Sequence, residues 1–324
     1  MPQRLLKLST LFLLALLFRQ YAPAQEANLH KGSNLSRIDS LRLPPAIATQ
    51  LRNAVSAHHY IAAEKILLHA IDHCHNIDQK VLLLEFTGSI YYLDKDYLHS
   101  VVAWNKSAAI APLPATLQFS LAMTYIQLGR PDWAKASLAS LALHYPENAL
   151  YPYWLGRLSY DSHRYNKAIR YFQKTIQLAP KMAKAYNNLG LCYYYLNQNN
   201  NAISSYKKSI ELNLQSGHPS AWPYLNLAIT QEFLNQISAA ETNLKQSIHL
   251  NPGLPLADLH LGDIYEHQGK LQQAVQEYQL AAHLNSSDAE PHFDLARIYQ
   301  RLGETKLAQK EVQDYLRLHH QQAQ

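Results

Sequence analysis

Residues 149–182 read ALYPYWLGRLSYDSHRYNKAIRYFQKTIQLAPKM, and residues 183–216 read AKAYNNLGLCYYYLNQNNNAISSYKKSIELNLQS. The two segments have equal length and carry small residues at matching places: Gly156 and Gly190 are eighth, and an alanine is twentieth in both. An aromatic residue is twenty-fourth in each segment. A fixed period of about 34 residues is typical of a repeat protein in which each copy is one supersecondary unit. These two segments therefore predict the architecture of the chain around them.

The same pattern recurs along residues 44–322. Its eight copies begin near residues 44, 81, 115, 149, 183, 221, 255 and 289, with a short insertion at 217–220. The twentieth residue is alanine in seven copies, and the eighth is glycine or alanine in seven. We therefore expect one array of similar units rather than a set of unrelated domains.

Each copy has the spacing of two amphipathic helices. Its fourth, seventh, eighth and eleventh residues share one stripe of a first helix, and its twentieth, twenty-fourth and twenty-seventh share a stripe of a second. Glycine at the fifteenth place, as at Gly129, Gly269 and Gly303, ends the first helix in a left-handed conformation. One such unit cannot bury its own stripes, so neighbouring units must stack. The sequence predicts an all-α fold.

These residues resemble the tetratricopeptide repeat (TPR) family. The small residues at the eighth and twentieth places carry the resemblance, together with a proline near the end of a copy, as at Pro180 and Pro252. The resemblance implies a right-handed α-solenoid, or superhelix, of helix-turn-helix units without catalytic activity. It also implies that the first helices line a concave groove, where members of the family usually bind extended peptides.

The N-terminal segment has the features of an export signal. A basic start precedes an apolar run at residues 8–18, and residues 22–24 (APA) form a small-residue cleavage pattern. The alternative is a membrane anchor, but the run is shorter than the roughly 20 apolar residues that span a bilayer. We predict a cleavable signal peptide at 1–24, a flexible polar lead-in at 25–43, and a periplasmic or secreted protein.

Composition narrows the class of protein. The 324 residues include 29 Lys and Arg against 24 Asp and Glu, a formal net charge of +5. Three of the basic residues lie in the predicted signal peptide, so the exported chain is closer to neutral. Nucleic-acid binding requires many cationic contacts with phosphates, and this balance does not provide them. Apolar residues make up 48% of the chain and charged residues 16%, which excludes a disordered protein.

Side chains that face away from the packing stripes are the candidates for function. On the first helices they include aromatic residues, amides and, toward the C-terminus, acidic residues. The predicted binding residues are Phe119, Tyr153, Trp154, Arg157, Tyr160, Lys184, Asn187, Asn188, Tyr194, Trp222, Asn226, Glu232, Phe233 and Asp263, and the same face carries His260 and Glu266.

Two functions remain open for this face. Trp154 and Trp222 are predicted anchors, because aromatic side chains give a large contact area at low entropic cost. Asn188 and Asn226 could each pair with a peptide backbone through one donor and one acceptor. Lys184 and Asn188 do not match the carboxylate clamp of the family, so capture of a chain terminus is not expected. The face would serve a scaffold that binds an extended peptide or a partner protein, or it would bind glycans as an accessory of polysaccharide secretion.

The strongest candidates for metal ligands are His69 and His73, because residues at i and i+4 share a helical face. They lie on the second helix of the first copy, which matches the repeat pattern least well. We therefore expect polar surface residues there and neither a metal nor a cofactor. The sequence has no nucleophile-elbow, phosphate-loop, dinucleotide-binding or HExxH pattern. We therefore expect that the protein is not an enzyme.

Overall fold

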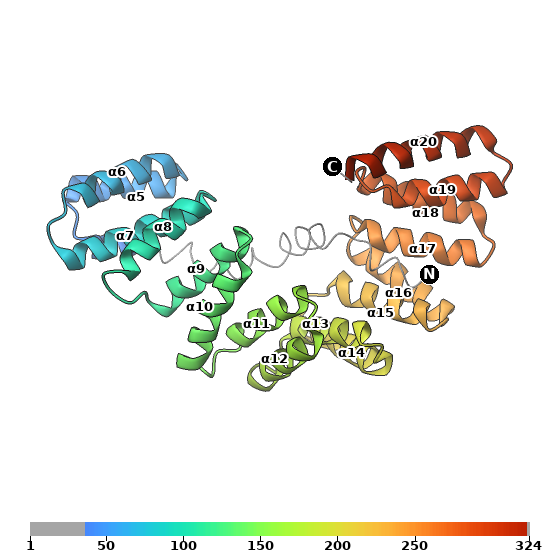
Figure 1. Ribbon diagram of the computed structural model, residues 1–324, viewed down its shortest axis with the longest axis horizontal. Helices are drawn as coiled ribbons and strands as arrows, with labels where there is room; N and C mark the ends of the chain where they lie inside the picture. The colour runs from blue at the N-terminus through green and yellow to red at the C-terminus, as the bar shows by residue number, and fades with distance from the viewer. Residues whose placement is uncertain (1–35, 323–324) are drawn as a thin grey trace. The chain divides into compact units, whose positions relative to one another are not determined.

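The structure, a computed structural model, describes residues 36–322, and every regular element in that range is a helix (Figure 1). The elements, in chain order, are η1 (Ile38–Leu41), α5 (Pro45–Ser56), α6 (Tyr60–Asp72), α7 (Ile77–Leu93), α8 (Tyr97–Ala108), α9 (Ala115–Gln127), α10 (Pro131–His144), α11 (Leu150–Asp161), α12 (Tyr165–Leu178), α13 (Ala183–Tyr195), α14 (Asn199–Gln215), α15 (Ala221–Phe233), α16 (Ile237–Leu250), α17 (Pro255–His267), α18 (Leu271–Leu284), α19 (Glu290–Arg301) and α20 (Thr305–Gln322). The sixteen α-helices of this range supply two helices for each of the eight predicted copies, which confirms the all-α fold.

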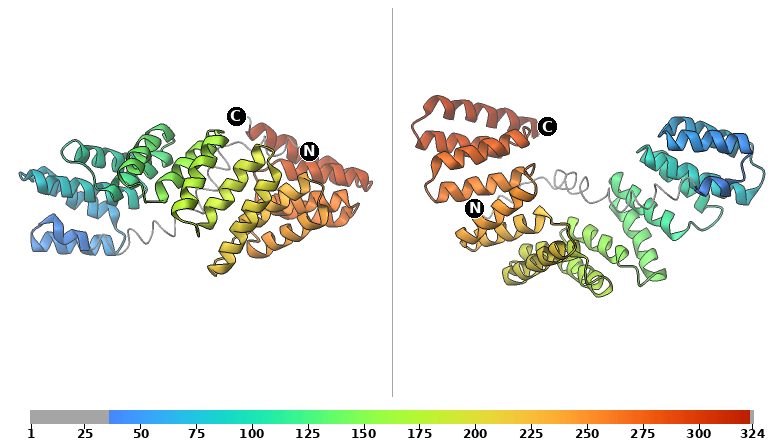
Figure 2. Two further views of the ribbon diagram at one scale, coloured as in Figure 1. Left: turned by 90° about the horizontal axis from the view of Figure 1, so that it is seen from below. Right: turned by 180° about the vertical axis from the view of Figure 1, so that it is seen from behind.

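The chain divides into two compact units, one ending at His163 and the other beginning at Arg164. In the described part of the first unit, the helices form the packed pairs α5–α6, α7–α8 and α9–α10, followed by α11. In the second unit, α12 precedes the pairs α13–α14, α15–α16, α17–α18 and α19–α20. Figure 2 shows these pairs from two further directions. Each pair is one helix-turn-helix copy of the predicted repeat.

A left-handed residue separates the two helices of every copy. Gly129, Gly269 and Gly303 have φ values of 67°, 75° and 79°, which confirms the conformation predicted for them. Non-glycine residues with φ between 55° and 64° hold the same place in the other copies: His58, Lys95, His163, Asn197 and Asn235. In the third copy, the backbone nitrogen of Arg130 donates to the carbonyl oxygen of Tyr125 at 2.8 Å, as in a helix that ends with a left-handed residue. The turn therefore keeps the same backbone conformation in copies that lack the glycine.

The buried core follows the predicted stripes. The twentieth residue of a copy is fully buried in the first seven copies and half-buried in the last, at Ala308. The twenty-fourth residue is also fully buried in the first seven copies, and it includes the large rings of Trp104, Tyr206 and Tyr278. In the last copy the same place is held by Val312, whose side chain is 45% exposed. Helix α20 thus presents a partly exposed apolar face.

The predicted flexible lead-in is wrong for residues 36–43. Ile38 and Leu41, on η1, are 0% and 1% exposed and belong to the core cluster that includes Phe86. The side-chain amide of Gln79 donates to the carbonyl oxygen of Leu41 at 2.9 Å, so the segment is also tied down by its backbone. Two apolar side chains one helical turn apart thus join this segment to the core of the first hairpins.

The second copy also begins earlier than its predicted start at residue 81. Helix α7 begins at Ile77 because the side chain of Asn76 accepts a hydrogen bond from the backbone nitrogen of Gln79 at 2.9 Å and so caps the helix. The signal peptide predicted at 1–24 and the part of the lead-in at 25–35 lie outside the described residues. Within the described range, no helix combines the length and the apolar character that a membrane span requires.

Candidate binding surface

In the first compact unit, the predicted binding residues come from two first helices. They are Phe119 on α9 and Tyr153, Trp154, Arg157 and Tyr160 on α11. Tyr153 and Arg157 are buried, and the other three side chains are half-buried. The Arg157 guanidinium lies 5.9 Å from the ring centroid of Tyr160 and 3.8 Å from the Asp161 carboxylate. Burial raises the pKa of Asp161, and the neighbouring positive charge of Arg157 opposes that shift.

In the second unit, amide side chains link two consecutive first helices. Asn187 and Asn188 lie on α13, and Asn226 lies on α15. The Nδ2 of Asn226 donates to the Oδ1 of Asn187 at 3.0 Å. Asn188 holds the same place in its copy as Asn226, whereas this hydrogen bond reaches the preceding residue, Asn187. Lys184 lies half-buried on α13, one turn before these amides.

About two helical turns further along the same two helices, two aromatic side chains meet. The rings of Tyr194 and Phe233 pack edge to face with centroids 6.2 Å apart. Phe233 is 48% exposed, whereas Tyr194 is half-buried. Burial, together with the charges of Tyr195 and Glu232, raises the pKa of Tyr194 to about 12, so its hydroxyl is protonated at neutral pH. Trp222, the other predicted anchor in this unit, is half-buried at the start of α15.

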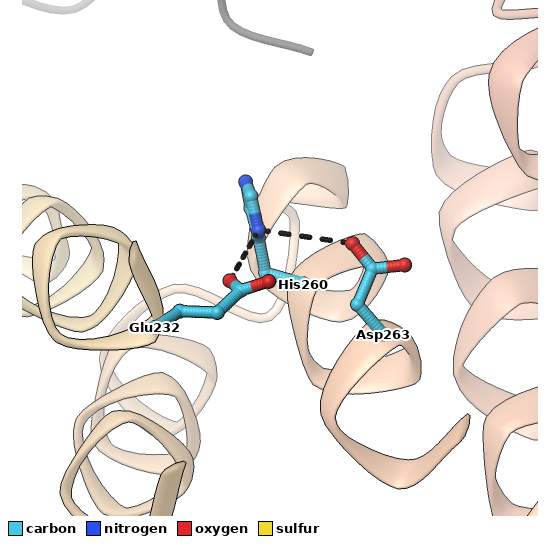
Figure 3. Close-up of side chains that lie close together, drawn as sticks. All are labelled: Glu232, His260 and Asp263. Carbon is cyan, nitrogen blue, oxygen red and sulfur yellow. Dashed lines mark hydrogen bonds and ion pairs between the residues drawn. The ribbon is translucent and has the colours of Figure 1, made fainter. Parts of the chain in front are cut away.

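An imidazole and two carboxylates continue the surface from α15 to α17. The Nδ1 of His260 lies 2.8 Å from the Oε2 of Glu232 and 4.0 Å from the Oδ2 of Asp263 (Figure 3). The hydroxyl of Tyr278, on α18, donates to the Oδ1 of Asp263 at 2.7 Å. Within the predicted acidic stretch, His260 thus faces two carboxylates, those of Glu232 and Asp263.

Arginines from α19 pair with the remaining carboxylates of this stretch. Arg297 lies 2.6 Å from Glu266 and 2.7 Å from Asp294, and Arg301 lies 2.8 Å from Glu266. The sequence reasoning missed these pairs. The pairs of Glu266 with Arg297 and Arg301 could have been predicted from the repeat length. A residue about 34 positions further along the chain lies at the equivalent place on the adjacent copy.

The two histidines considered as metal ligands lie against each other on α6. The rings of His69 and His73 stack with centroids 4.2 Å apart, and the Nδ1 of His73 lies 2.8 Å from the carbonyl oxygen of His69. One nitrogen of the pair is thus engaged with the backbone. Both side chains are exposed, as predicted for polar surface residues.

Comparisons with known proteins agree with this architecture. Family models described as "Tetratricopeptide repeat" match residues 119–181 and 181–250, and a model described as "TPR repeat" matches residues 262–303. No curated protein matches the chain by sequence.

Among solved structures, the chain is similar to a tetratricopeptide repeat protein from Parabacteroides merdae. The two are 14% identical, the match covers 85% of this chain and 99% of that one, and the TM-score is 0.60. It is also similar to PilW, described as a widely conserved type IV pilus biogenesis factor, at 22% identity over 61% of this chain and 90% of that one, with a TM-score of 0.55. The family matches cover more than half of the chain, and the stacked helical hairpins agree with them. The chain belongs to the tetratricopeptide repeat family.

Proposed function

We propose that the protein is a non-catalytic scaffold that binds an extended segment of a partner protein along α13 and α15. The binding surface consists of Tyr194, Asn226 and Phe233 together with the amides of Asn187 and Asn188, which are buried until a partner draws on them, and we refer to it as the amide–aromatic surface. The observation that supports the proposal is that Phe233 contacts Tyr194 about two helical turns beyond the hydrogen bond between Asn226 and Asn187, on the same two helices. Apolar and polar recognition elements thus follow each other along two consecutive copies.

The aromatic part of the surface would supply most of the binding energy. Phe233 leaves 48% of its side chain exposed, and the edge-to-face packing with Tyr194 restricts its rotation before a partner arrives. An aromatic side chain that is already held in place loses little entropy on binding, and such residues dominate the energetics of interfaces.

The amide part would set the direction and register of the partner. An asparagine side chain has both a donor and an acceptor, as a peptide group does. Asn226 uses one donor on Asn187 and has a second hydrogen on the same nitrogen as well as its carbonyl oxygen. This arrangement suits a partner in extended conformation, whose backbone groups point sideways at regular intervals.

Two further parts of the proposal concern location and the competing ligand. The predicted signal peptide would place the protein in the periplasm or outside the cell, and fractionation of cells that produce the full chain would test this. The glycan alternative remains a prediction, since exposed aromatic rings also stack on sugars. A direct comparison of peptides with oligosaccharides separates the two.

The decisive experiment selects peptides from a random displayed library on the full chain and measures their affinity by calorimetry. Replacing Phe233 with alanine should weaken binding by roughly tenfold or more, as expected for loss of an aromatic anchor. Phe293→Ala is the matched control, because Phe293 is 51% exposed on another first helix of the same unit. Equal losses in the two variants would contradict the assignment, and binding of oligosaccharides but not of peptides would favour the alternative.

A further inference from the structure

Three side chains able to ligate a metal ion meet on α15 and α17. The Nδ1 of His260 is 2.8 Å from Glu232 Oε2 and 4.0 Å from Asp263 Oδ2, and one donor atom from each residue lies within 4.8 Å of the others. Figure 3 shows that the edge of the imidazole carrying Nδ1 is turned toward both carboxylates. Two helices thus direct one nitrogen and two oxygens toward a common point.

The separations suit the first coordination shell of a small divalent cation. Zn²⁺ binds nitrogen and oxygen ligands at about 2.0–2.2 Å, so the ligand atoms of a tetrahedral site lie roughly 3.4 Å apart. The observed 2.8 Å and 4.0 Å lie on either side of that value. The side chains of His260 and Asp263 are only 8% and 9% exposed, so little water competes for these positions.

A hydrogen bond from outside the triad orients one of the carboxylates. The Tyr278 hydroxyl donates to Asp263 Oδ1, which leaves Oδ2 directed toward His260. In metal sites, partners of this kind fix the orientation of the ligands and tune affinity.

A second group with the same donor types shows the contrast. His292, Glu311 and Asp314 also bring three donor atoms within 4.8 Å of one another. There, however, Arg317 lies 2.9 Å from Asp314 and lowers the pKa of that carboxyl through its hydrogen bond. The Asp314 carboxylate is therefore already paired with the guanidinium of Arg317.

We propose that Glu232, His260 and Asp263 form a binding site for Zn²⁺. One imidazole with two carboxylates is a donor set that Zn²⁺ accepts readily and that Ca²⁺, which takes six to eight oxygen ligands, does not. Three protein ligands leave a fourth coordination position open. The bound ion would join α15 to α17 and stabilise the second compact unit by mass action. This site does not depend on the partner proposed above.

The test is a calorimetric titration of Zn²⁺ into the chelator-treated full chain. We expect one site of defined stoichiometry, lost or weakened at least about tenfold in the Asp263→Asn and Glu232→Gln variants. Tyr278→Phe should also weaken binding by about tenfold, because it keeps the buried ring and removes the hydroxyl that orients Asp263 and also reaches Glu266. Co²⁺ in place of Zn²⁺ gives a visible spectrum that reports coordination by these ligands.

Three control variants test whether Zn²⁺ binding arises from Glu232, His260 and Asp263. His283→Ala removes an exposed histidine on α18 and should leave the titration unchanged. His292→Ala tests the second group and should also leave it unchanged. Phe233→Ala should alter peptide binding but not Zn²⁺ binding, so the two proposals can fail separately. The absence of binding, or binding that persists at full strength in Asp263→Asn and Glu232→Gln, would overturn the assignment.

Discussion

The ring of Tyr278 packs so closely on Gly262 that a Cβ atom on the glycine would lie 2.6 Å from the ring carbon Cε1. The same relationship holds between Gly190 and Tyr206, at 2.5 Å. Copies with alanine at the eighth place carry a smaller side chain at the twenty-fourth, leucine beside Ala122 and Ala228 and valine beside Ala296. The size of the residue on the first helix is therefore matched to the size of the side chain on the second.

This matching predicts the effect of adding one methyl group. Gly190→Ala should lower the free energy of unfolding by about 1–3 kcal/mol, because overpacking against Tyr206 outweighs the gain of up to about 1 kcal/mol in helix propensity. Adding Tyr206→Leu to this variant recreates the alanine–leucine pair of the other copies. Chemical denaturation of the two single variants and the double variant should show a favourable coupling energy. Strict additivity would mean that the close contact is not what requires the glycine.

A second prediction concerns the left-handed turn residues. Lys95 has φ of 64° and Asn197 has φ of 58° at equivalent places. A side chain in this conformation costs about 1 kcal/mol, less for asparagine, and glycine avoids it. Lys95→Gly should therefore stabilise the protein by a few tenths to about 1 kcal/mol, and Asn197→Gly by less. Thermal denaturation checks the order of the two effects, and the reverse order would contradict the conformational explanation.

The hairpins could be predicted from the sequence because their signals are local and repeated. The alanine at the twentieth place and the glycines at the fifteenth each mark a contact inside one copy of about 34 residues. The left-handed conformation of Lys95 and His163 was not predicted. Neither residue type prefers this conformation, and the packing of the two helices imposes it.

The candidate surface was only partly predictable. The face of each first helix was predicted from helical periodicity, and Asn226, Glu232 and Phe233 all lie on the first helix α15. Which of them touch depends on how one copy is placed against the next, and a period alone does not set this offset. The hydrogen bond from Asn226 to Asn187, one residue before the equivalent place at Asn188, is an example.

A third prediction tests the N-terminal correction. Ile38 and Leu41 are buried in the core of the first hairpins, so Leu41→Ala should lower the free energy of unfolding by about 2–5 kcal/mol. Ser40→Ala is the control, since this exposed residue lies on the same short helix. Hydrogen exchange should show lost protection in α5 and α7 for the first variant only. Equal protection in both variants would restore the idea of a loose lead-in.

The last prediction concerns a buried carboxyl group on α17. Asp258 is 3% exposed, and its Oδ2 has no hydrogen-bond partner among the described residues. Burial, with the charge of Glu277 nearby, raises the pKa of Asp258 to about 7. Burial also raises the pKa of Glu277, and Lys245 opposes that shift. The folded state therefore favours the protonated form of Asp258 more strongly than the unfolded state does.

The sign of the pH dependence follows from this difference. The stabilisation is fully present below the pKa of the unfolded chain, near 3.8, and is lost as the pH rises toward about 7. The loss is at most about 4 kcal/mol, at 1.36 kcal/mol for each unit of pKa difference. Asp258→Asn should remove this dependence and be more stable than the natural chain at pH 8. Denaturation curves from pH 4 to pH 8 compare the two, with Asp263→Asn as the control for loss of a neighbouring carboxylate. Parallel stability profiles for Asp258→Asn and the natural chain would show that Asp258 is ionised in the folded protein throughout this range.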